Sequence, residues 1–200
     1  MKPFWDIEES KGFQQIKAFD GLYYSVYTSN KGDNQEAADL LACIRRDLNT
    51  LLIYLHDNPQ LWMNHRIAFG IYHAFDIHIP AWNTNKKLTL NYLNTNGELF
   101  NYQEMTPNKY GIIGLNKPKV VVKLKRPGLQ DYPIAQKRSI FLTLRNNGKF
   151  DKYPKILDLA IHEITHTVCN DVEWKEDNHK NPYPEYNKLM LQWAKECGIL

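Results

Sequence analysis

The sequence predicts an α+β fold, with a small sheet over one helix and an additional long amphipathic helix. Residues 13–29 alternate loosely between apolar and polar side chains and are rich in Tyr, Val and Ile, which is typical of strands. From residue 34 onward, apolar residues recur at steps of three and four, as on one face of a helix. The segment 138–145 alternates again, and a second helical stripe follows it from residue 154.

The composition is that of a single globular domain. The chain has 200 residues, of which 43% are hydrophobic and 24% charged, with ten Gly and ten Pro. A chain of this length buries a core without help from disulfides. We expect one domain over residues 1–200, in which residues 1–70 form an N-terminal strand and helix portion and residues 138–200 hold the chemistry.

Charge and cysteine content limit the possible classes. The net charge of +3 is well below that of a dedicated nucleic-acid module, although it permits an acidic partner. Cys43, Cys169 and Cys197 form no CxxC pair, so reduced thiols are expected. The amino terminus lacks the apolar run of a secretory signal, and no apolar stretch is long enough to span a bilayer. The sequence therefore predicts a soluble protein of the cytoplasm without a membrane partner.

The N-terminal portion contains the best-defined helix. One or two strands within residues 13–29 should end in the turn at residues 30–33. The helix that follows should run from Asn34 to about Asp57, capped by Asp33 or by Asn34 itself. A second, shorter helix is expected over residues 61–69.

The middle of the chain predicts strands and loops. Residues 71–125 are punctuated by turn sequences. The basic segment 117–126 alternates in its second half, which favours a strand with its lysines in water over a nucleic-acid groove. The segment 138–145 is the clearest strand, and we expect its residues 140–144 to form the edge of a substrate cleft.

The chemistry-bearing residues lie on the helix that begins near Pro154. His162 and His166 are four residues apart, so their imidazoles project side by side and can bind one ion. Glu163 between them completes the pattern His162-Glu163-Ile164-Thr165-His166, the HExxH signature of zinc peptidases. Zinc lowers the pKa of a bound water, and a glutamate beside the first histidine takes its proton. Metal ligands and base must share one rigid element, which explains the spacing.

A catalytic zinc site requires a third protein ligand. His179 is the first candidate, because an imidazole is the usual partner of two others. Glu185, about eighteen residues beyond His166, is the rival. Val172 stands where the compact HExxHxxGxxH form has its third histidine, so that form is excluded. Asp171 and Asp177 suit helix-end, turn or hydrogen-bonding roles, Tyr183 or Tyr186 suits packing or donation to an oxyanion, and Cys169 suits packing.

The C-terminal third of the chain resembles the intracellular zincin metallopeptidases of the SprT/WLM (Spartan-like) and minigluzincin type. The likeness is carried by residues 139–145 (SIFLTLR), 157–167 (LDLAIHEITHT) and 177–190 (DNHKNPYPEYNKLM). In those families a histidine followed closely by an aromatic residue and a helix supplies the third ligand, which implies His179 here. Residues 35–46 also resemble a helix that precedes the core in virus-encoded relatives, which would place the protein in a host cytoplasm or nucleus.

Together these observations predict a zincin-like domain that hydrolyses peptide bonds in a polypeptide substrate. One Zn²⁺ would be held by His162, His166 and His179, with Glu163 as general base. Two alternatives remain open. The resemblance implies a DNA-associated protease that acts on DNA-protein crosslinks, in which residues 117–126 touch nucleic acid. A noncatalytic module with a closed, four-ligand structural zinc is the other.

Overall fold

The mixture of helices and strands predicted from the sequence is confirmed. The computed structural model describes residues 12–28, 31–76, 79, 82, 87–96, 100–106, 113–124, 132–170 and 179–200. The elements, in chain order, are β1 (Phe13–Lys17), β2 (Tyr23–Tyr27), α1 (Asn34–Asp57), the 3-10 turn η1 (Pro59–Leu61), α2 (Ala68–Asp76), α3 (Leu90–Asn96), β3 (Phe100–Glu104), β4 (Gly114–Leu124), β5 (Tyr132–Leu142), β6 (Arg145–Asn146), β7 (Lys149–Phe150), α4 (Tyr153–Val168) and α5 (Tyr183–Glu196).

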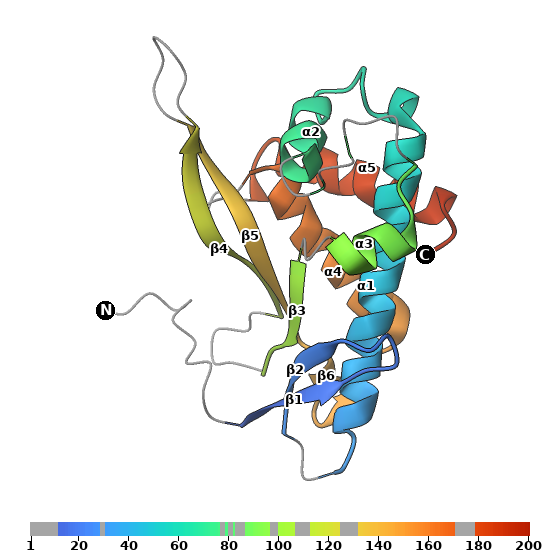
Figure 1. The fold of residues 1–200 in the computed structure, drawn as a ribbon, viewed down its shortest axis with the longest axis vertical. Coiled ribbons are helices and arrows are strands. Elements are labelled where there is room, and N and C mark those ends of the chain that lie inside the picture. The colour runs from blue at the N-terminus through green and yellow to red at the C-terminus, as the bar shows by residue number, and fades with distance from the viewer. Residues whose placement is uncertain are drawn as a thin grey trace.

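A mixed sheet of five strands forms one side of the fold. Its order is β1-β2-β3-β5-β4, in which β3 is parallel to both β2 and β5, whereas β4 is antiparallel to β5. Figure 1 shows α1 and α4 on the same side of β3, β4 and β5, and α4 contacts both β4 and β5. The sheet therefore lies against the helix that carries the HExxH sequence.

The prediction that residues 140–144 form the cleft edge is wrong. Residues 140–142 belong to β5, which is enclosed between β3 and β4. Ile140 and Leu142 lie on the same face of the strand and are fully buried, which explains the alternating pattern in the sequence. Such alternation does not distinguish an inner strand from an edge strand. The strand at the edge beside α4 is β4, which includes the described part of the basic segment.

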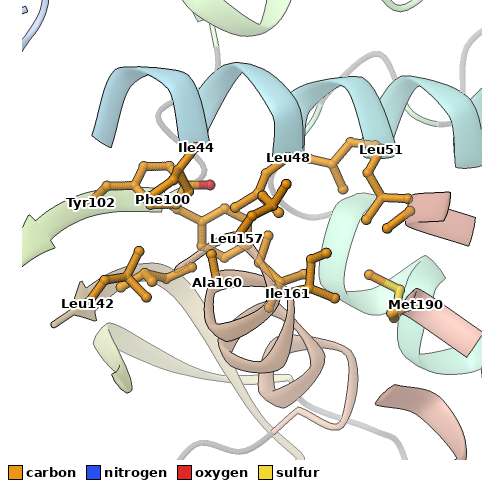
Figure 2. Packing of buried hydrophobic residues seen from close by; sticks show 14 of the residues in the cluster. Ile44, Leu48, Leu51, Phe100, Tyr102, Leu142, Leu157, Ala160, Ile161 and Met190 are labelled. Atoms are coloured by element: carbon orange, nitrogen blue, oxygen red, sulfur yellow. The ribbon is translucent and has the colours of Figure 1, made fainter. Parts of the chain in front are cut away.

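Helix α1 has the predicted boundaries and organises the core. Its buried side chains follow helical spacing, and Asp33 occupies the N-cap position without a side-chain cap hydrogen bond. Figure 2 shows Ile44, Leu48 and Leu51 of α1 facing Leu157 and other side chains from α4 and the sheet. All four of these residues are fully buried. The long N-terminal helix and the HExxH helix thus share one hydrophobic core.

The two helices that follow α1 in the chain, α2 and α3, differ from the prediction. The expected helix at residues 61–69 is absent at that position: Pro59–Leu61 form a 3-10 turn, and the next α-helix, α2, begins only at Ala68. Helix α3 was not predicted at all, although Thr89 caps it by accepting a 3.1 Å hydrogen bond from the Tyr92 amide. Within the described residues, none of the helices combines the length and apolar content that crossing a membrane requires.

Candidate metal centre

Helix α4 holds His162 and His166 in adjacent turns of the same face. Pro154 lies in its first turn, where a missing amide hydrogen costs nothing. The apolar stripe that includes Ile161 and Ile164 is fully buried, which fixes the rotation of the helix. The two imidazole ring centres are 5.1 Å apart. Because the apolar stripe faces the core, the two histidines lie together on a different face of α4.

His179 joins this pair, as the sequence predicted. Its ring centre lies 5.0 Å from that of each partner, and the Nε2 atoms of His162 and His179 are 3.1 Å apart. The candidate ligand atoms of all three histidines lie within 4.8 Å of one another. His179 is exposed and precedes α5, so the group combines two candidate ligands from one helix with one from a separate segment, at an accessible surface.

The three imidazoles are suited to a metal ion by distance and by protonation state. A tetrahedral zinc with Zn–N bonds of about 2.0–2.1 Å places its nitrogens about 3.3 Å apart, close to the 3.1 Å separation observed. Burial, together with repulsion from His166 and His179, lowers the pKa of His162 from 6.5 to about 4. His162 is therefore neutral at physiological pH, with a lone pair to offer a cation. The three histidines can therefore hold a metal ion, but their arrangement does not identify the metal.

Glu163 follows His162 on α4 and is buried against the sheet. Its exposed fraction is 4%, and burial raises its pKa from 4.5 to about 8. The carboxyl group lies against the backbone of β4 at Gly114. A methyl group added there would collide with Glu163 Oε1 and come within 2.8 Å of Leu159 Cδ1. Only glycine lets the edge strand approach the carboxyl group this closely.

Asn116, two residues further along β4, joins the edge strand to α4. Its side-chain amide donates to the Glu163 carbonyl oxygen and, at 2.8 Å, to Thr167 Oγ1. Its carbonyl oxygen accepts from Arg138 Nη1 of β5 at 3.1 Å. Arg138 is 2% exposed and Asn116 is half-buried, so the network is largely shielded from water. The network fixes the position of the edge strand relative to the backbone of Glu163.

Tyr183 packs against all three histidines. Its ring stacks on His166 with centres 4.5 Å apart, and it also contacts His162 and His179 at 5.0 and 4.9 Å. Its hydroxyl donates to the His162 carbonyl oxygen at 3.2 Å, and the residue is almost fully buried. These contacts favour packing and ligand orientation over donation to an oxyanion. Tyr186 likewise donates to a backbone oxygen, that of Arg66, at 2.8 Å.

Glu185 is not part of the histidine group. It lies exposed in the first turn of α5. Cys169 forms the C-cap of α4 and is also not in the group, which among the described residues contains the three histidines alone. Val172, Asp171 and Asp177 lie outside the described residues. Sequence reasoning missed Gly114 and Asn116, because an isolated glycine or asparagine in a strand carries no motif.

Comparisons of the chain with protein-family models, with curated proteins and with solved structures found no match.

Proposed function

We propose that this chain is a zinc-dependent metallopeptidase of the zincin type. One observation carries the proposal: the nitrogens of three histidines converge while a buried carboxyl group projects from the same helical turn. Helix α4 supplies two ligands and the base, and His179 supplies the third ligand. Three protein ligands are typical of catalytic zinc, which keeps a position for water, whereas closed structural sites have four.

The bound zinc and Glu163 would have different roles in hydrolysis. Bound zinc would supply an acidified water and polarise the scissile carbonyl. Glu163 takes a proton from the attacking water and delivers it to the leaving amine nitrogen. Burial alone keeps this carboxyl group protonated near neutral pH. A cation held by the three histidines would favour the carboxylate, which is the form that acts as a base.

The edge strand β4 offers a docking position for substrate. Among the described strands β4 pairs only with β5, so its other edge has main-chain groups available to an extended polypeptide. Gly114 on this strand touches Glu163, so a peptide paired there would run past the base. This placement supports an extended polypeptide as the substrate and replaces β5 by β4 as the cleft edge.

The proposal is tested by measuring zinc content and proteolysis on the same samples. We expect one zinc per chain in wild type and in Glu163→Gln, and cleavage of an unfolded protein by wild type only. His179→Ala should lose zinc, whereas Glu185→Ala, as matched control from the rival position, should keep both zinc and activity. Absence of zinc from wild type, or cleavage by Glu163→Gln at the wild-type rate, would refute the proposal.

A cleavage assay with added DNA distinguishes the DNA-associated protease from a protease that acts without DNA. Single-stranded DNA added to the cleavage reaction at low and high salt should stimulate proteolysis only if nucleic acid binds, and salt should then suppress the effect.

A further inference from the structure

The edge strand β4 and its partner β5 are strongly basic. Together they contain four lysines and one arginine and no acidic residue, whereas Asp and Glu outnumber Lys and Arg in the rest of the chain. Three of the lysines, Lys117, Lys119 and Lys123, belong to β4. Arg138 is buried and bonded to Asn116, so the charge that a partner would meet is that of the lysines. Such a local excess of positive charge favours an acidic partner.

The β4–β5 pair extends beyond the rest of the sheet. Strand β3 pairs with residues 138–142 of β5, so among the described strands residues 132–137 pair with β4 alone. Figure 1 shows both strands continuing past the end of β3. The outer edge of β4 thus runs from the body of the protein along this two-stranded extension, and no described strand pairs with it.

Strand β4 begins beside the proposed catalytic base. Its first residue, Gly114, lies against Glu163, and the Asn116 side chain donates to the Glu163 carbonyl oxygen. At about 3.3 Å per residue, the strand reaches Lys117 about 10 Å and Lys123 about 30 Å beyond Gly114. An extended peptide that pairs with β4 near Gly114 would therefore pass the base first and the lysine positions afterwards.

Strand β4 has features that discourage pairing with an arbitrary strand. Pro118 has no amide hydrogen to donate, and the register of β4 against β5 shifts between Pro118 and Val121. Lysines on an edge strand likewise repel other strands that are neutral or basic. An acidic strand is the exception, because its carboxylates are attracted to the same lysines. This attraction acts over about 8 to 10 Å, so it does not require an unbroken hydrogen-bond ladder.

We propose that the substrate of this site is an acidic polypeptide segment, held along β4 with Asp or Glu about three to nine residues from the cleaved bond. This inference rests on the proposed metallopeptidase function. Main-chain pairing near Gly114 would place the bond at Glu163, and the lysines would select the sequence beyond it. Each opposite-charge pair across neighbouring strands favours pairing by about 1.4- to 5-fold. Nucleic acid suits the edge less well, because it has no peptide groups with which to extend a sheet.

The test uses peptides that share one cleavable centre and carry glutamate, glutamine or lysine in a flanking segment about three to nine residues away. One set has this segment on the amino side and another on the carboxyl side. Fluorescence anisotropy with Glu163→Gln measures binding, and kcat/KM of wild type measures cleavage. In at least one set the glutamate peptide should be at least about threefold better than the glutamine peptide in both assays, and high salt should reduce the difference.

The binding assay separates this inference from the proposed function. Binding to Glu163→Gln does not require hydrolysis, so it decides the preference even if wild type cleaves no peptide, a result that would count against the proposed function instead. Equal binding of the glutamate and glutamine peptides in both sets would overturn the acidic preference. Competition by single-stranded DNA without any preference among the peptides would assign β4 to nucleic acid and would overturn it as well.

Charge reversal locates the preference on β4. Lys119→Glu combined with Lys123→Glu should make the lysine peptide bind better than the glutamate peptide. Lys188→Glu combined with Lys195→Glu changes the net charge equally at two exposed positions of α5 and should keep the wild-type order. Urea unfolding checks that both double variants fold. If the β4 variant folds and still prefers the glutamate peptide, β4 is not the docking surface.

Discussion

Burial of Glu163 predicts an unusual pH dependence for the metal-free protein. The folded protein holds the proton on this carboxyl group up to pH about 8, whereas the unfolded chain releases it near 4.5. The folded state therefore binds more protons than the unfolded state in this window, so the free energy of unfolding should fall as pH rises through it. A difference of this size corresponds to about 4 to 5 kcal/mol over the whole window.

His162 contributes with the opposite sign. Its pKa is lowered from 6.5 to about 4, so its contribution to stability is present above 6.5 and is lost as pH falls toward 4. The two effects largely offset each other below pH 6.5. Between pH 6.5 and 8 the effect of Glu163 should stand alone, at about 2 kcal/mol.

Urea unfolding of chelator-treated protein at pH 5, 6.5 and 8 measures this dependence. The difference in unfolding free energy between wild type and Glu163→Gln isolates the glutamate, since other groups titrate in both proteins. Glu185→Gln removes an exposed carboxylate from a neighbouring element and should leave the pH profile of wild type unchanged. Parallel profiles for wild type and Glu163→Gln would refute the argument that desolvation governs this carboxyl group.

Two further predictions concern the edge strand and the core. Gly114→Ala should displace the Glu163 carboxylate, lowering kcat for peptide cleavage by about ten- to a hundredfold with zinc content unchanged, and wild-type kcat would contradict the placement of β4. Leu48→Ala should cost about 2 to 5 kcal/mol in thermal or urea unfolding because Leu48 is fully buried, whereas Leu90→Ala, at a leucine 38% exposed, should cost far less.

The sequence predicted features that repeat with the period of a secondary-structure element. Helix α1 was placed at its observed ends because apolar residues mark its buried face over more than six turns. His179 was predicted on the chemistry of histidine as a ligand, together with a family resemblance, and the structure brings it to the other two histidines. Both signals are local or depend on residue type.

Features that depend on strand order were beyond the reach of the sequence. Periodicity within β5 could not show that β4 covers it on one side and β3 on the other. The roles of Gly114 and Asn116 follow from the pairing of β4 with β5, because this pairing sets both residues against α4. The short helix α3 was missed because a seven-residue segment is too brief to show a helical period.

The division of the metal ligands between two segments gives the proposed zinc a role in folding as well as in hydrolysis. His162 and His166 belong to α4, whereas His179 precedes α5, and residues 171–178 connect them. An ion that binds all three acts as a crosslink present only in the folded state. By mass action, free zinc at a thousand times its dissociation constant would add about 4 kcal/mol to stability. Zinc would thus add to the burial of Met190 and Trp193 in holding the C-terminal helix against the core, and chelation would remove that added stability.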